Sequence, residues 1–398
     1  MRPPSATAAW VLSLSALVAL AVAASAAGAT TPGAAAPGAS AAADSAGDYY
    51  TRADFARVDK IDAHVHLHGR AERFMAQAMA DRFRVLTINV DSPDFPPLPE
   101  QQQTAVALRE RYPGWVAFAA AFSADGFGSP GWGAAAVRQI DGAVAQGAIG
   151  VKIWNNIGMV LRNADGSYVM PDDPRLEPVI AHLEQHHIVL LGHQAEPLNC
   201  WLAPEKMTVR SDRDYFREHP QYYMYRHPEM PTQDAILAAR DRMLRAHPQL
   251  HFDGVHLASL EWDVDRVAAF LDRFPNAVVD LAARLVHLEY QATSNPDKVR
   301  RFLIRYQQRI LYGSDTAYGP KESAPAEIAA LHADWLKDWS FLVTSERMHS
   351  PDFDAAFPGL RLPRTVVDRI YRGNAEALFA NAWTTQPATR PAPAGAQP

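Results

Sequence analysis

Two histidines separated by one residue are the first residues in this sequence whose side chains could take part in a chemical reaction. They end the stretch Lys60-Ile61-Asp62-Ala63-His64-Val65-His66, a short apolar run of alternating side chains. Residues two apart on a β-strand point to the same face, so His64 and His66 would present two imidazoles side by side. Neutral imidazoles bind divalent metal ions. The pair is half of a metal site, although histidines two apart also occur on solvated strands.

Other reactive side chains occur at or near the ends of later β-rich runs. Lys152 lies in one run, His193 and Glu196 end the next, His256 ends another and Asp315 ends the last. Each has an ordinary structural explanation when taken singly. A histidine can bond to a carbonyl, an aspartate can cap a turn, and a lysine or glutamate can form an ion pair. Their shared position at strand ends favours one common site.

Short β-rich runs alternate with amphipathic stretches through most of the chain. The runs are nearly continuous in apolar residues, which is typical of parallel strands covered on both faces. Several helical stretches stop before a proline, as at Phe274-Pro275. The expected strands are 60–66, 84–90, 115–122, 148–154, 187–193, 250–257, 276–281 and 309–314. The expected helices are 133–146, 174–185, 232–246, 263–274 and 296–307.

Eight such repeats, without a Gly-x-Gly-x-x-Gly motif after the first strand, predict an α/β fold of the (β/α)8 TIM-barrel type rather than an open doubly wound sheet. Residues 51–383 are expected to form this one domain. A long, aromatic-rich connection after the fifth strand, from Pro197 to His247, predicts a lid insertion over the mouth of the barrel. Packing of its aromatic residues onto the barrel is the simpler alternative.

The two ends of the chain have a different composition. Arg2 precedes an uncharged run that leads to Ala24-Ser25-Ala26, a pattern typical of a cleaved signal peptide over 1–26. A single membrane anchor is the alternative. Residues 27–50 and 384–398 are rich in small residues and proline, which predicts a disordered linker and a disordered tail. The protein is therefore expected in the periplasm or outside the cell, with no stable membrane insertion after cleavage.

Charge and cysteine content exclude several other classes of protein. Lys and Arg total 38 against 44 Asp and Glu, a net charge of -6 that gives no electrostatic footprint for nucleic acid. The single cysteine, Cys200, excludes an intrachain disulfide framework and a cysteine-rich zinc site. A small-molecule substrate is the expected partner, and homo-oligomerisation stays open.

Several motifs together resemble the amidohydrolase superfamily, in particular the amidohydrolase-related group that includes aminocarboxymuconate-semialdehyde and resorcylate decarboxylases and several lactonases. The resemblance covers nearly the whole folded region. It implies that His64, His66, His193 and Asp315 bind one divalent metal ion, with Zn²⁺ the expected metal, and that His256 is a catalytic histidine. The motifs are Asp62-Ala63-His64-Val65-His66, 147–152, Val255-His256-Leu257, 310–315 and 373–379.

Lys152 leaves the number of metal ions open. In the superfamily members with two metals, a lysine at the end of the fourth strand is carboxylated and bridges both ions. In members with one metal it has no such role. We expect one ion, and two if Lys152 is carboxylated.

The reaction that this site predicts is metal-dependent hydrolysis. A bound metal brings the pKa of water towards about 7, Asp315 would shuttle the proton, and His256 would stabilise the oxyanion formed from an ester, lactone or amide. The same residues would also serve a non-oxidative decarboxylase of a small aromatic or unsaturated acid. A barrel that binds a ligand without turnover is a third hypothesis, and the presence of both proton carriers argues against it.

Four residues just beyond the strands are expected to contact the substrate. Trp154 and Asn155 follow the fourth strand, and Trp262 follows the sixth. Arg284 follows the seventh strand and is the natural partner of a carboxylate if the substrate is anionic.

Overall fold

The computed structural model describes residues 48–319 and 324–384. The chain divides into two units after Asp48, and every helix and strand described belongs to the second unit. The signal peptide predicted over 1–26 lies outside the described residues, as do nearly all of the predicted linker and tail, so all three remain predictions. No helix within the described ranges is long and apolar enough to span a bilayer.

Parallel strands form a sheet that closes on itself. They follow one another in chain order from β1 to β8, and β9 pairs with the free side of β1. The backbone N–H of Ala63 donates to Tyr312 O at 2.9 Å, and that of Asp315 donates to His64 O at 2.8 Å, so β8 and β9 act as two parts of one closing strand. The predicted TIM barrel is confirmed. The strands are β1 (Lys60–Leu67), β2 (Phe83–Ile88), β3 (Val116–Ala121), β4 (Gly150–Ile153), β5 (Val189–Gly192), β6 (Phe252–Gly254), β7 (Ala277–Asp280), β8 (Ile310–Leu311) and β9 (Thr316–Tyr318).

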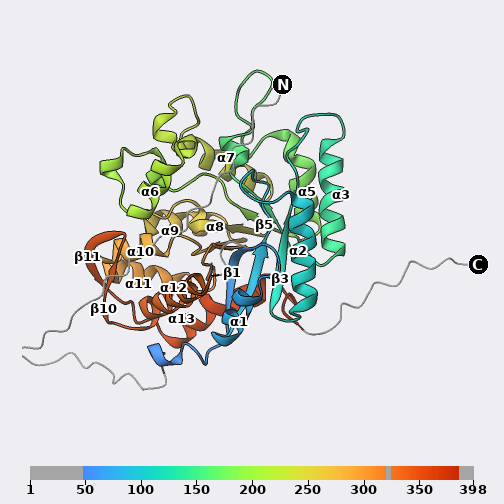
Figure 1. The fold of residues 1–398 in the computed structure, drawn as a ribbon. Helices are drawn as coiled ribbons and strands as arrows, with labels where there is room; N and C mark the ends of the chain where they lie inside the picture. Colours follow the sequence, from blue (N-terminus) through green and yellow to red (C-terminus); the bar gives the residue numbers. More distant parts are fainter. Residues whose placement is uncertain (1–47, 320–323, 385–398) are drawn as a thin grey trace, which may run out of the picture. The chain divides into compact units, whose positions relative to one another are not determined.

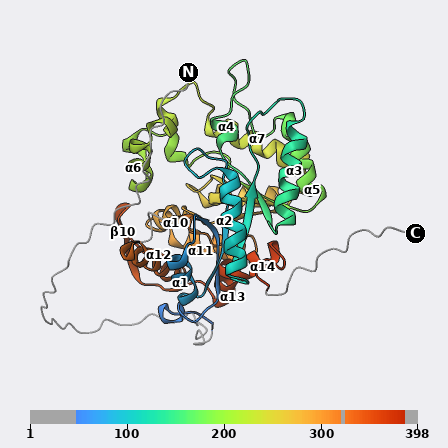
Figure 2. The same ribbon diagram turned by 45° about the vertical axis from the view of Figure 1, so that its right-hand side comes forward.

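Helices lie around the outside of these strands (Figures 1 and 2). Local sequence explains several of their first turns, because the side chains of Thr232, Asp263 and Asn295 each accept a backbone N–H at the start of α7, α9 and α11. All five stretches expected to be helical are helical. The helices are α1 (Glu72–Ala80), α2 (Leu98–Arg111), α3 (Trp132–Ala145), α4 (Asn156–Met159), α5 (Glu177–Gln185), α6 (Arg210–Glu218), α7 (Gln233–Ala246), α8 (Val255–Ala258), α9 (Val264–Arg273), α10 (Leu285–Ala292), α11 (Pro296–Arg305), α12 (Pro325–Val343), α13 (Arg364–Asp368) and α14 (Asn374–Leu378).

The interior of the barrel is apolar towards the amino ends of its strands. Ala375 of α14, and Phe379 and Trp383 after it, pack with strand residues such as Leu86 and Leu191 in one buried cluster. The indole N–H of Trp383 donates to the carbonyl of Val85 at 3.1 Å. This end is filled by side chains, and the carboxyl ends of the strands are left as the place for a site.

The sixth and eighth strands fall furthest short of their predicted ends. The sixth, expected over 250–257, ends at Gly254, because residues 256–259 take left-handed φ angles of 54–59°. The eighth, expected over 309–314, is interrupted after Leu311, and Asp315 has a φ of 67°. Both predictions of strand length are wrong. Left-handed backbone begins two residues after the sixth strand, whereas at the eighth it comes only at Asp315, four residues beyond Leu311. Left-handed backbone is costly for residues other than glycine and collects at functional sites.

The long connection between β5 and β6 contains α6 and several 3₁₀ turns before α7 returns along the barrel. The backbone N–H of Ser211 donates to Asp352 Oδ1 at 2.7 Å, which ties α6 to the hairpin of β10 (Arg347–Ser350) and β11 (Phe353–Pro358). Tyr222 Oη donates to Asp94 Oδ2 at 2.9 Å, in the loop after β2. We call residues 198–230 the insertion. Its predicted role as a lid remains a proposal.

Candidate metal centre at the mouth of the barrel

The side chains of His64, His66 and Asp315 meet at the carboxyl ends of β1 and β8. Asp315 Oδ1 lies 3.3 Å from His64 Nε2 and 3.2 Å from His66 Nε2. Ligand atoms about 2.0 Å from a tetrahedral ion are roughly 3.3 Å from one another. The three side chains therefore have the spacing of ligands to one ion, and they form one of the compact groups suited to metal binding.

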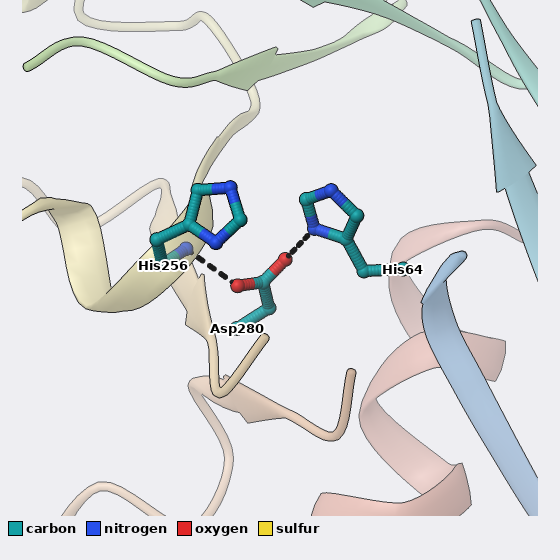
Figure 3. Close-up of side chains that lie close together, drawn as sticks. All are labelled: His64, His256 and Asp280. Carbon is teal, nitrogen blue, oxygen red and sulfur yellow. Dashed lines mark hydrogen bonds and ion pairs between the residues drawn. The ribbon is translucent and has the colours of Figure 1, made fainter. Parts of the chain in front are cut away.

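The second ring nitrogen of each histidine is already bonded. His66 Nδ1 lies 2.8 Å from the carbonyl of Ile88, and His64 Nδ1 lies 2.6 Å from Asp280 Oδ2 (Figure 3). A carbonyl or a carboxylate at this position fixes the hydrogen on Nδ1 and leaves the lone pair of Nε2 free. Metal-binding histidines are commonly oriented in this way.

His193, at the end of β5, lies beside this group. Its ring centroid is 4.3 Å from that of His256, and its Nε2 is buried without a hydrogen-bond partner. Such an orphaned buried nitrogen is uncommon and fits a ligand of an ion. The preceding residue, Gly192, has no room for a side chain, because a Cβ there would lie 2.3 Å from the ring of Phe252. His193 is not one of the three mutually close side chains, so its predicted ligation remains a prediction.

Asp280, at the end of β7, links His64 to His256. One oxygen accepts from His64, and the other accepts the backbone N–H of His256 at 2.6 Å (Figure 3). His256 Nδ1 lies 2.9 Å from the carbonyl of Ala282, which can only accept, so Nδ1 carries the hydrogen. In the neutral ring the lone pair of His256 Nε2 is therefore free to accept a proton or bind an ion.

Sequence reasoning missed Asp280, although its signal was present. Asp280 is a polar residue after the apolar Val278-Val279, at the end of a strand that was expected over 276–281. His193 and Asp315 were predicted as site residues because they are polar residues at strand ends, and Asp280 meets the same criterion. Arg284, the residue predicted to contact the substrate from this part of the chain, lies beyond the strand.

Burial sets the charge of these groups. It lowers the pKa values of His64, His193 and His256 well below their usual range, and the positive charge of Lys152 lowers them further. Burial alone would raise the pKa of Asp315, but the neighbouring groups His66, His64 and Lys152 together hold it below its usual range. Neutral imidazoles with an ionised carboxylate are a suitable donor set for Zn²⁺ or a similar ion.

Lys152 lies among the predicted ligands. Its Nζ is 3.3 Å from His64 Nε2, and the residue is only 3% exposed. Burial lowers the pKa of Lys152 to about 8, while the carboxyl groups of Asp315, Asp280 and others act in the opposite direction. The fourth strand thus brings its lysine to the site, as the sequence predicts for either number of metal ions.

Two of the four predicted substrate contacts lie at this mouth. Asn155 Nδ2 donates to Glu196 Oε1, and Arg284 Nη2 lies 3.8 Å from Glu196 Oε2. Trp154 packs on the apolar interior of the barrel, and Trp262 packs on the core outside it. Glu196 itself is buried, which raises its pKa to about 7.

A second set of buried charges surrounds Arg284. Asp212 of the insertion lies 3.3 Å from His287 Nε2, and the carboxyl groups of Asp212, Glu261 and Glu196 all stabilise the Arg284 cation. Sequence reasoning missed Asp212, Glu261 and His287 in this role. Asp212 lies on α6, Glu261 in a loop and His287 on α10, where no strand-end rule applies.

Comparison with known proteins gives one family match and several similar solved structures. The sequence profile of the family described as amidohydrolase matches residues 61–380. No curated protein gives a significant match. Similar solved structures include an uncharacterised TIM-barrel protein from Bordetella bronchiseptica, with 14% identity, 82% of this chain and 99% of that chain covered, and a TM-score of 0.48. A 2,6-dihydroxybenzoate decarboxylase from Rhizobium has 14% identity, with 81% and 98% covered and a TM-score of 0.45. A manganese-bound 5-carboxyvanillate decarboxylase from Novosphingobium aromaticivorans has 13% identity, with 82% and 98% covered and a TM-score of 0.43.

A closed parallel barrel with a histidine and aspartate cluster at its carboxyl end defines a class of metal-dependent enzymes that act on small molecules. Because the family profile spans most of the sequence, the chain belongs to the amidohydrolase family. The resemblance seen in the sequence is confirmed at this level.

Proposed function

We propose that this protein is a metal-dependent hydrolase of a small ester, lactone or amide. One observation supports this most strongly: Asp315 Oδ1 lies within 3.3 Å of the Nε2 atoms of both His64 and His66. An ion held there, which we propose to be a single Zn²⁺, would lower the pKa of water towards about 7 and polarise a carbonyl. His193 is the proposed fourth protein ligand.

Side chains of the protein carry out the proton transfers and stabilise the oxyanion. Asp315 takes a proton from water as the water oxygen bonds to the carbonyl carbon. The C–O or C–N bond then breaks, and the leaving oxygen or nitrogen receives that proton. The buried ammonium of Lys152 is the donor best placed to stabilise the oxyanion.

The geometry gives His256 a different role from the one that the sequence suggested. Its Nδ1 hydrogen is committed to the carbonyl of Ala282. The neutral ring therefore has no hydrogen on Nε2 to offer an oxyanion, and it can only accept a proton there. We propose that His256 is a second proton carrier, which becomes able to donate after it has been protonated.

Decarboxylation of a small aromatic or unsaturated acid is the second candidate. The observation that favours it is the same Lys152 ammonium, which would pair with a substrate carboxylate beside His64. Carbon dioxide would leave, and Asp315 or His256 would deliver a proton to the carbon. Export to the periplasm or beyond, proposed from residues 1–26, is compatible with either reaction.

Labelled water separates the two reactions. The zinc-loaded full chain is incubated in H₂¹⁸O with dihydrocoumarin, a cyclic aryl ester, and separately with 2,6-dihydroxybenzoate. Hydrolysis requires ¹⁸O in the acid formed from dihydrocoumarin at a rate that Asp315→Asn abolishes. Release of CO2 from 2,6-dihydroxybenzoate, lost in the same variant and without any ester hydrolysis, would overturn the proposal in favour of the second candidate.

A further inference from the structure

A cavity of about 240 Å³ opens beside the metal centre. Its walls come from the segment after β4, from Glu196 after β5, and from the insertion. Asn155 and Glu196 lie at its inner end, and Glu196 Oε1 is 3.8 Å from His193 Nε2. One carboxyl group therefore faces both the cavity and the predicted metal ligands. The cavity lies next to the candidate metal centre, and Glu196 borders both.

The wall of the cavity is largely apolar, and its three methionines make it conformationally adaptable. Met159 contributes from α4, while Met224 and Met230 contribute from the insertion, together with the ring of Tyr222. Thioether side chains fit irregular apolar and aromatic groups. A cavity of roughly 150 Å³ is enough to bind benzene, so this one has room for a single substituted ring.

The charges at the inner end disfavour an anion. Arg284 is the cation nearest Glu196, and its charge is already compensated by the carboxyl groups of Glu196, Asp212 and Glu261. At the rim, Arg162 is held in its own loop by the carbonyl of Gly166 at 3.0 Å and by the ring of Tyr168. Lys152 is the other cation near Glu196 among the described residues, and the carboxyl groups of Asp315, Asp280 and Asp253 already compensate its charge. A ligand carboxylate would therefore meet the carboxyl group of Glu196 where both neighbouring cations are already balanced.

We propose that this cavity binds an uncharged, ring-sized apolar group of the substrate, and that Glu196 accepts a hydrogen bond from a hydroxyl or amide N–H on that group. The inference rests on the proposed function for the reaction itself, and it adds the substrate class. Neutral cyclic or aromatic esters, lactones and amides carrying such a donor are the compounds that fit. The proposal excludes substrates that carry a carboxylate on the ring bound in this cavity. Asn155, which donates to Glu196, holds that carboxyl group in place.

Benzamide and benzoate are nearly isosteric probes that differ in charge. Both are titrated into the zinc-loaded full chain with ¹³C-methyl methionine, and the signals are assigned by Met→Leu variants. We expect benzamide to shift the signals of Met159, Met224 and Met230 and to bind at least tenfold more tightly than benzoate. Met79 on α1, which is 41% exposed, is the control signal that should stay in place.

Glu196→Gln tests the carboxyl group directly, since it is close to isosteric. The ratio of the two affinities should fall below threefold in this variant, because the charge that repels benzoate is gone. Equal binding of the two probes to the unmodified chain, or benzamide shifts confined to other methionines, would overturn the inference. The methyl signals do not depend on turnover. Repeating the titration on Asp315→Asn therefore keeps the result separate from success or failure of the proposed hydrolysis.

Discussion

Two lysines are buried at opposite ends of the barrel, and their surroundings differ in kind. Lys60 begins β1 at the amino end, where its Nζ donates to the carbonyls of Phe55 at 2.5 Å and Val58 at 2.8 Å. The rings of Phe55 and Phe83 lie 4.5 and 4.8 Å from the same atom. Lys152 lies at the carboxyl end, where its neighbours are an imidazole and several carboxyl groups from other strands.

The difference separates a structural lysine from a functional one. Backbone carbonyls and aromatic rings satisfy the ammonium of Lys60 within one local unit. Lys152 instead has the titratable groups His64, Asp315, Asp280 and Asp253 as partners. A buried lysine surrounded by groups that can themselves bind ions or move protons belongs to a site.

The largest effect is expected at the carboxyl end. Asp315→Asn should lower kcat/KM by about 10³-fold, because it removes both a proposed metal ligand and the proton carrier. Far-UV circular dichroism should be unchanged. Asp59→Asn is the matched control at the amino end, since Asp59 is half exposed and pairs with Arg82 at 2.6 Å. An Asp315→Asn enzyme with unimpaired turnover would remove Asp315 from the mechanism.

Exchanging each lysine for methionine tests the comparison itself. Lys152→Met should lower kcat/KM by about 10²-fold, the cost of losing one oxyanion donor. Lys60→Met should leave kcat/KM within about twofold while it lowers the free energy of unfolding by about 1–3 kcal/mol, because two buried carbonyls lose their donor. Denaturant titration and steady-state kinetics on both variants measure this. A catalytic loss in Lys60→Met would break the distinction between the two ends.

The pH dependence of stability tests the protonation of Lys60. Burial lowers the pKa of Lys60 in the folded protein to about 7, from 10.5. Between these values the unfolded chain holds a proton that the folded chain lacks, so stability rises with pH, by up to about 1.4 kcal/mol per pH unit. Below pH 7 the contribution is constant and unfavourable. The difference in free energy of unfolding between the unmodified chain and Lys60→Met should widen from pH 7 to pH 10, and a flat difference would argue that Lys60 stays protonated.

The smallest effect on catalysis is expected at Trp262. Its ring packs on the core, with the guanidinium of Arg266 at 5.4 Å. Trp262→Leu should therefore change kcat/KM by less than about threefold while costing roughly 1–3 kcal/mol of stability, as for other losses of buried aromatic area. A selective rise in KM would restore the substrate contact that the sequence suggested.

The sequence predicts the barrel and the residues that end its strands, because both depend on local periodicity. Alternation along β1 is enough to pair His64 with His66. Local periodicity does not predict the left-handed backbone at His256 and Asp315, since those conformations are imposed by packing between strands that are distant in the chain. The hydrogen bond that fixes the tautomer of His256 is likewise accepted by the carbonyl of Ala282, which follows another strand.

Residues outside the strands show where sequence reasoning ends. Arg284 was expected to be free for a substrate carboxylate. In the structure Asp212 and Glu261 compensate its charge, because the insertion folds back onto the loop after β7. Contacts of this kind depend on the path of a long irregular segment, for which no periodic pattern exists.

Metal stoichiometry tests the central claim most directly. Elemental analysis of the purified full chain should give one divalent ion per chain, falling close to zero in His66→Ala and in Asp315→Ala. His68→Ala is the matched control, because His68 is the next histidine of the same alternation but lies just after β1. One ion retained in His68→Ala and lost in the other two is the predicted result. No metal in the unmodified chain, or a content that His66→Ala leaves unchanged, would contradict the account.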